Sequence, residues 1–235
     1  MSGFRFKQFY VEQEHTAMKV GTDGVLLGAW ASHTNPSHIL DLGTGTGLLT
    51  LMLAQRYPQA QLSAVELDEA AFKQAQFNVQ QSLWSERIQL FHRDIVAFSQ
   101  SNNQKFDLIV ANPPYFETGC QCRSTARHLA RYTDTLTHLD WLRIAADCLS
   151  DEGNIAFVLP FSAGEQLKTW AKSTALYCVA QTDIITKTGK TPQRMLLSFA
   201  FQERPREKKI LAIYDENSQY HPDFITLTQA FYLRF

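Results

Sequence analysis

The sequence has few cysteines and no long apolar run. Its four cysteines, Cys120, Cys122, Cys148 and Cys178, include no C-x2-C pair of the kind found in zinc sites, so we expect reduced cysteines and no metal site. No apolar stretch approaches the roughly 18 residues that a membrane helix needs, and the N-terminus lacks the apolar core of a secretory signal. We therefore expect a soluble cytoplasmic protein with no membrane partner.

The sequence also lacks an excess of charge of either sign. Its 22 Lys and Arg residues almost balance 23 Asp and Glu residues, giving a net charge of −1. If a polyanion is the partner, local basic patches must attract it, because global charge does not. Hydrophobic residues make up 45% of the 235-residue chain, which excludes a mainly disordered protein and suits one large α/β domain.

From residue 38 onward, short apolar runs alternate with stretches of helical periodicity. This alternation is typical of βα units, which form a mostly parallel sheet with helices on both faces. The linker between the last two apolar runs is too short for a crossover helix, so these two strands should form an antiparallel C-terminal hairpin. The seven predicted strands cover residues 38–42, 61–66, 87–91, 106–111, 154–159, 177–185 and 194–201, and the helices between them cover residues 48–57, 69–82, 136–149 and 163–174.

A glycine-rich turn, D-L-G-T-G-T-G, spans residues 41–47, where the first of these strands ends and a helix begins. Its glycines permit a tight turn and a close backbone approach to a cofactor. Dinucleotide dehydrogenases usually have G-x-G-x-x-G instead, and Asp41 would repel a pyrophosphate but can accept a hydrogen bond from an α-ammonium group. The pattern thus favours a cofactor that contains an amino acid, and the residues expected to bind it are Asp41, Gly43, Thr44, Gly45 and Gly47.

Two further acidic residues follow the next strands. Glu66 ends the second strand 23 positions after Gly43, close to the roughly 20 positions at which an acidic residue meets ribose hydroxyls. Asp94 follows the third strand and can accept from an adenine amino group while Ile95 packs against the ring; a helix N-cap is the alternative role for Asp94. The expected nucleoside-binding residues are therefore Glu66, Leu67, Asp94 and Ile95.

The motif Asn112-Pro113-Pro114-Tyr115 directly follows the fourth strand, at the same edge of the sheet. Proline has no backbone N–H, so each proline offers a ligand only a hydrogen-bond acceptor, its carbonyl oxygen. The Asn112 side-chain oxygen and the Pro113 carbonyl can accept both N–H groups of a planar amine, which favours a pyramidal nitrogen with its lone pair free to attack, while Tyr115 stacks on the base. We expect all four residues to be catalytic, with Asn112 also beside the cofactor.

Taken together, the strand-end residues resemble the S-adenosylmethionine site of class I methyltransferases over roughly residues 38–160. The N-P-P-Y motif resembles the (N/D)-P-P-(Y/F) signature of amino-methyltransferases. This resemblance implies a Rossmann-like class I methyltransferase fold and S-adenosylmethionine as cofactor. The motif serves adenine N6 in DNA or RNA, guanine N2 in ribosomal RNA and glutamine amides in release factors, so it leaves the substrate open. An NAD-dependent oxidoreductase would have no use for N-P-P-Y, and a non-catalytic RNA-binding module would not need Asn112 and Tyr115.

Segments along the whole chain closely resemble the bacterial tRNA adenine-N6-methyltransferases that modify adenine 37, beside the anticodon, in a valine tRNA. These segments are K-V-G-T-D-G-V-L-L-G-A-W, D-L-G-T-G-T-G-L-L, V-A-N-P-P-Y-F, A-R-Y-T and L-T-Q-A-F-Y-L-R-F. The resemblance implies that Thr22 and Asp23 close over the methionine end of the cofactor. A release-factor glutamine methyltransferase and a guanine-N2 ribosomal RNA methyltransferase remain the alternatives.

Basic residues cluster near the N-P-P-Y motif and around the predicted hairpin. A base beside the anticodon lies in a single-stranded loop, from which it is splayed out at less cost than from a duplex. We therefore expect tRNA as the partner, no DNA, because the chain has no room for a target-recognition domain, and no obligate protein partner. Besides Tyr115, the residues expected to contact tRNA are Arg123, Arg127, Arg131, Lys187, Lys190 and Arg194.

We expect one methyltransferase domain over residues 1–235. It divides into an N-terminal cap segment (1–37), a catalytic core (38–202) and a C-terminal tail packed on the core (203–235). Within the cap segment, G-T-D-G followed by V-L-L-G-A-W predicts a short capped helix. The tail is rich in aromatic residues, which we expect to pack in the core rather than on RNA bases.

Overall fold

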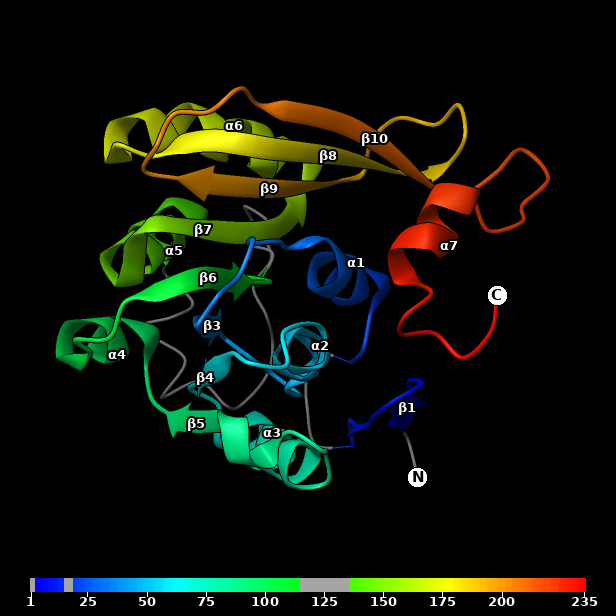
Figure 1. Cartoon of the computed structure of the whole chain (residues 1–235). Coiled ribbons are helices and arrows are strands. Elements are labelled where there is room, and N and C mark those ends of the chain that lie inside the picture. Colours follow the sequence, from blue (N-terminus) through cyan, green and yellow to red (C-terminus); the bar gives the residue numbers. More distant parts are fainter. Residues whose placement is uncertain (1–2, 15–18, 115–135) are drawn as a thin grey trace, which may run out of the picture.

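The computed structural model describes residues 3–14, 19–114 and 136–235. Within these ranges the main sheet has eight strands in the order β10-β8-β9-β7-β6-β3-β4-β5, and a separate two-stranded hairpin pairs β1 (Gly3–Arg5) with β2 (Tyr10–Glu12). Figure 1 shows the sheet with helices on both of its faces. The strands of the main sheet are β3 (His38–Leu42), β4 (Gln61–Glu66), β5 (Ile88–His92), β6 (Phe106–Ala111), β7 (Leu149–Pro160), β8 (Tyr177–Lys187), β9 (Arg194–Ala200) and β10 (Glu207–Tyr214).

The helices pack in two layers against the sheet. Their bounds are α1 (Thr22–Trp30), α2 (Leu48–Arg56), α3 (Glu69–Gln80), α4 (Ile95–Ser101), α5 (His138–Cys148), α6 (Phe161–Ala171) and α7 (Pro222–Thr228), with 3-10 turns at Ser85–Arg87 and Lys172–Thr174.

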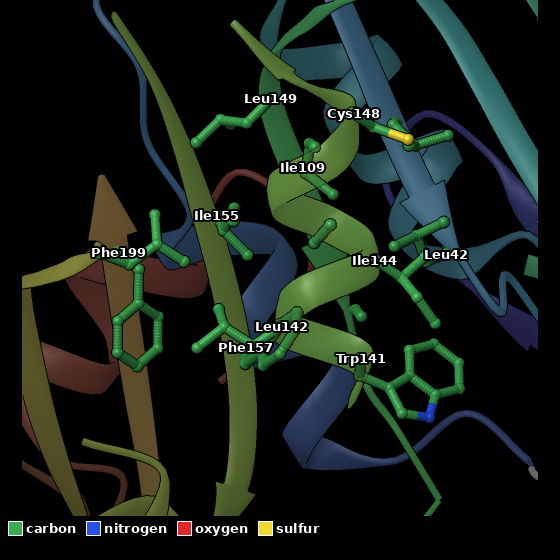
Figure 2. Packing of buried hydrophobic residues seen from close by; sticks show 14 of the residues in the cluster. Leu42, Ile109, Trp141, Leu142, Ile144, Cys148, Leu149, Ile155, Phe157 and Phe199 are labelled. Carbon is green, nitrogen blue, oxygen red and sulfur yellow. The ribbon is translucent and has the colours of Figure 1, made fainter. Parts of the chain in front are cut away.

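Side-chain alternation along the central strands creates these two layers. Leu40 and Ile109 join a buried cluster with α4, α5 and α6, part of which is drawn in Figure 2. Their neighbours Ile39 and Leu108 point to the opposite face and pack with α1, α2 and α7. Both faces are covered, which is why the central strands read as continuous apolar runs in the sequence.

The predicted arrangement of strands is confirmed, but the predicted number is wrong. Strands β3, β4, β5, β6 and β7 run parallel, and β8 and β9 form the expected antiparallel hairpin. The eighth strand, β10, lies in the segment predicted as a tail and pairs in parallel with β8. Its residues 207–210 are all exposed because it is an edge strand, so it carries no alternating apolar pattern at its start.

Parallel pairing brings the carboxyl ends of four strands to one edge of the sheet. Leu42 at the end of β3 pairs with Val65 of β4 and with Ala111 at the end of β6, while Glu66 pairs with His92 at the end of β5. The segments that follow these strands carry the motifs singled out in the sequence. Of the helices described, none is long and apolar enough to cross a membrane.

Candidate active site

The glycine turn after β3 adopts a left-handed backbone at three positions. The φ angles are +67° at Gly43, +58° at Gly45 and +83° at Gly47, where a Cβ would be strained. A Cβ at Gly43 would also lie 2.9 Å from the ring of Trp141, whereas a Cβ at Gly45 would meet nothing within 4 Å. Gly43 is therefore required by packing, and Gly45 leaves an open space beside the turn.

Asp41, at the end of β3, stabilises the glycine turn through hydrogen bonds to its side chain. Its Oδ2 accepts hydrogen bonds from the hydroxyls of Thr44 (2.6 Å) and Thr50 (2.7 Å) and from the Thr50 backbone N–H (3.2 Å). Burial raises the pKa of the Asp41 carboxyl to about 6 although these hydrogen bonds oppose the change. Its Oδ1 is buried and has no hydrogen-bond partner among the described residues, so it is available to a donor.

Glu66 contacts the same turn from the end of β4. Its Oε2 accepts from the Gly45 N–H at 2.8 Å, and its Oε1 accepts from the Asp68 N–H at 2.9 Å. Burial raises the pKa of this carboxyl as well. The Leu67 carbonyl lies 3.0 Å from Nε2 of His92. Two backbone donors thus fix the carboxylate beside the glycine turn.

Asp94 does cap a helix. Its Oδ1 accepts from the N–H groups of Val96 (2.9 Å) and Ala97 (3.1 Å), which are the first donors of α4. Its Oδ2 is buried and accepts no hydrogen bond from the described part of the chain. Capping therefore uses only one oxygen and leaves the other for a ligand. Ile95 is buried in the cluster beneath α4.

A cavity of about 410 Å³ lies beside the glycine turn. It brings together the N-terminal segment, the turn and the residue that follows β6, although these are far apart in the sequence. Sequence reasoning had singled out Thr22, Asp23, Gly43, Thr44, Gly45 and Asn112 among its lining residues, and had missed Lys19, Val20, Gly21, Gly24, Thr46, Leu48 and Leu49. Asp41, Gly47, Glu66, Leu67, Asp94 and Ile95 do not line this cavity.

The wall of the cavity contains an ion pair that the sequence did not reveal. Arg194, at the start of β9, donates through Nε to Oδ2 of Asp23 at 2.9 Å. Because Asp23 belongs to α1, this ion pair connects the start of β9 to the cap segment beside Asn112. Of the other predicted tRNA contacts, Lys187 donates to the Ser218 hydroxyl and Lys190 is exposed.

The first turn of α5 contacts both motifs. His138 lies against the backbone of Pro114, which raises the pKa of its imidazole, while burial, the larger effect, lowers it. Three residues on, Trp141 packs beneath Gly43. A capping box between Thr137 and Asp140 begins this helix. The T-x-x-D pattern signals the helix start, but contacts so distant in sequence leave no local signal.

The rest of the N-P-P-Y region is only partly described. Pro113 is buried, Asn112 is half-buried and Pro114 is exposed. The remaining predicted residues, Tyr115, Arg123, Arg127 and Arg131, lie outside the described residues.

Comparisons with known proteins agree with this geometry. The family described as "Methyltransferase small domain" matches residues 17–162. A tRNA1(Val) (adenine(37)-N6)-methyltransferase from Pasteurella multocida is 55% identical over all of this chain and 98% of its own length. A protein of the same name from Haemophilus influenzae is 58% identical over the full length of both chains. The chain belongs to this methyltransferase family.

Solved structures support the fold of the family. A predicted O-methyltransferase from Agrobacterium tumefaciens has a TM-score of 0.70 and 19% identity, over 89% of this chain and 96% of its own. The human methyltransferase 10 domain containing protein has a TM-score of 0.56 and 16% identity, over 83% of this chain and 90% of its own. At these identities the likeness concerns the fold alone, and it confirms the predicted class I methyltransferase fold.

S-adenosylmethionine is the cofactor of this methyltransferase family, as the motifs predicted. The site fits it in three respects. Asp41 and Asp94 each have one buried carboxylate oxygen with no partner among the described residues, and carboxylate oxygens suit ammonium and amino donors. Gly45 faces open space where a Cβ would intrude. The cavity also provides a concave surface of suitable size for a small ligand.

Proposed function

We propose that the protein transfers a methyl group from S-adenosylmethionine to N6 of adenine 37 in a valine tRNA. The observation that carries the proposal is that Asn112 shares one cavity with the glycine turn, so an amine held by the motif lies beside a cofactor held by the turn. The names of relatives that are 55–58% identical over the full chain support this choice of substrate.

Each strand end has a distinct proposed role in holding the cofactor. Oδ1 of Asp41 accepts from the α-ammonium group, the backbone from Gly43 to Gly47 packs against the methionine part, and Thr22 and Asp23 close over it. Glu66 accepts from the ribose hydroxyls next to Leu67. Oδ2 of Asp94 accepts from the adenine amino group, and Ile95 contributes to the apolar surface beside the ring.

The N-P-P-Y residues act on the substrate amine. When bound, S-adenosylmethionine supplies an electrophilic methyl group on a sulfonium. The Asn112 side-chain oxygen and the Pro113 carbonyl accept the two N–H groups of the adenine amine, which localises its lone pair. Pro114 fixes the turn, and Tyr115 stacks on the base. No strong base is needed, because the positively charged methylated nitrogen loses its proton readily.

The proposed partner is a folded tRNA whose anticodon loop enters the site. Arg123, Arg127, Arg131, Lys187, Lys190 and Arg194 would neutralise phosphates around it. We further propose a single methyltransferase domain over residues 1–235 that acts in the cytoplasm, does not use DNA and requires no protein partner.

The test is methyl transfer from labelled S-adenosylmethionine to small RNA from cells that lack this protein, followed by digestion to nucleosides. Label in N6-methyladenosine of a valine tRNA supports the proposal. Label in N2-methylguanosine would make guanine the target, and label that resists ribonuclease and stays with protein would make it a glutamine amide.

A pair of variants tests the role of Asn112. Asn112→Ala should abolish transfer while still binding S-adenosylhomocysteine, whereas Asn112→Asp retains an accepting oxygen and should keep measurable activity. If Asn112→Ala retained its cellular function without methyl transfer, the protein would be an RNA-binding module rather than an enzyme.

A further inference from the structure

A second groove lies away from the cofactor cavity. It has a volume of about 880 Å³ and is formed by the end of α6, the start of β8 and the segment between β9 and β10. Tyr177 is 43% exposed and lines it together with Leu176 and Pro205. Nothing in the proposed reaction uses this surface.

The strands of the sheet have two sets of ends, and the groove lies at the ends opposite to those where Asn112 follows β6. Strand β9 runs antiparallel to β7 (Figure 1). Arg194 therefore pairs with Pro160 near the active site, while Ala200 pairs with Tyr177 at the far edge. Tyr177 lies seven positions before Ile184 on β8, and Ile184 is the register partner of Arg194. At about 3.3 Å per residue, the groove begins roughly 23 Å from the active-site edge.

Positive charge dominates the groove. Four basic residues line it against two acidic ones, and one of the four, Lys168, is already paired with Glu165 at 2.6 Å. The other three are Lys172, Arg204 and Arg206, all exposed. None of them forms a salt bridge within the described part of the chain, although Arg204 donates to the Asn154 side chain. Arg206 lies close enough to Cys178 to lower the pKa of its thiol, against the larger effect of burial, which raises it.

This charge continues toward the active-site edge on the face that carries α6. Gln181 faces α6, because its Oε1 accepts from Lys168 at 3.0 Å, and its register partner in β10 is Lys208. The Lys208 side chain is 56% exposed and its ammonium lies 3.6 Å from Asp183. Several cations beside an exposed aromatic ring suit the sugar–phosphate backbone of a nucleic acid better than an acidic peptide, because the ring can stack on a base or sugar.

We propose that this groove is a second contact for the substrate, which binds the backbone of the tRNA body while the anticodon loop occupies the active site. The proposal rests on the proposed function, because it takes tRNA as the substrate. The groove would add affinity for whole tRNA and take no part in methyl transfer. It would thereby favour tRNA over short RNA that contains the same loop.

The test compares two substrates, an unmodified full-length valine tRNA transcript and its isolated anticodon stem–loop. The variants are Lys172→Glu alone and Lys172→Glu combined with Arg206→Glu, and Lys73→Glu on α3 at the other end of the sheet is the matched control. The double variant should raise KM for full-length tRNA about tenfold and reduce the salt dependence of tRNA binding by one to two phosphate contacts. Its kcat, and its kcat/KM for the stem–loop, should stay within about twofold of wild type.

Two results would overturn the proposal: an unchanged KM for full-length tRNA, or an equal loss on both substrates. Lys172→Glu alone is the safeguard against misfolding, because within the described part of the chain Lys172 is exposed and its side chain forms no hydrogen bond or salt bridge that would be lost. This single variant should give part of the effect. A filter-binding assay with the same tRNA needs no methyl transfer. If the wild-type protein bound tRNA without methylating it, the proposed function would fail, and binding by the variants would still decide whether the groove contacts RNA.

Discussion

Replacing Asp41 by Asn removes one buried charge from beneath the glycine turn and should change how stability depends on pH. The carboxyl is 1% exposed, and its Oδ2 already accepts hydrogen bonds from Thr44 and Thr50. Asn is nearly isosteric, so its oxygen can accept the same hydrogen bonds. Its amide group then occupies the position of Oδ1, where the described residues offer no partner.

The expected magnitude follows from the pKa of Asp41. Burial raises this pKa from 3.8 to about 6 in the folded protein. Between pH 4 and 6 the folded state therefore binds a proton that the unfolded state does not, and the free energy of unfolding falls as the pH rises through this window. Each pKa unit corresponds to about 1.4 kcal/mol, so the fall attributable to Asp41 is about 3 kcal/mol. The Asn variant lacks this contribution.

The measurement is urea unfolding of both proteins at several values between pH 4.5 and 7.5. The free energy of unfolding of wild type relative to Asp41→Asn should decrease by about 2 kcal/mol as the pH rises from 4.5 to 7.5, because part of the change lies below pH 4.5. Glu66 also has a raised pKa, but it is present in both proteins, so the difference isolates Asp41. Parallel pH profiles for the two proteins would refute the assignment of a raised pKa to Asp41.

Substitutions at four further positions separate packing from ligand binding and positioning. Gly43→Ala should lower the free energy of unfolding, measured in urea, by about 2 to 3 kcal/mol, because a Cβ there meets a tryptophan ring. Gly45→Ala should lower it by only about 1 kcal/mol, because a Cβ there meets no protein atom, but should weaken S-adenosylhomocysteine binding in calorimetry at least tenfold. Asp94→Ser retains a capping oxygen, so stability should change by under about 0.5 kcal/mol while the Kd for S-adenosylhomocysteine rises about tenfold. His138 lies against Pro114, so His138→Ala should lower kcat about tenfold with KM for the cofactor nearly unchanged, and His138→Gln, which keeps a polar donor at this place, should recover activity. Equal kcat for both variants would exclude a positioning role for His138 beside Pro114.

Features with a local cause were predictable from the sequence. Strands β3, β4, β6 and β7 read as short continuous apolar runs because both faces of the sheet are covered, and the helices between them carry apolar residues at helical spacing. The glycine turn and N-P-P-Y were identifiable because backbone geometry restricts which residues can occupy such positions. Parallel pairing then implied that these motifs meet at one edge, and Asn112 does line the cavity beside the turn.

Features that depend on partners far along the chain were not predictable. Strand β10 begins with exposed residues, since only one of its edges is paired. The sequence predicts a tRNA contact for Arg194 and gives no sign of its ion pair, because its partner Asp23 lies 171 positions away. No spacing rule relates such residues, and only the packed fold brings them into contact.

The structure gives one reason why the two halves of the proposed site are held in register. The glycine turn and the N-P-P segment follow different strands, yet both contact the first turn of α5, where Trp141 packs beneath Gly43 and His138 lies against Pro114. A capping box fixes the start of this helix, and its apolar face is buried against the sheet, so the turn cannot shift without disturbing the core. The spacing between the glycine turn and the N-P-P segment, and with it the proposed spacing of cofactor and amine, therefore depends on a helix that contributes no residue to the predicted motifs.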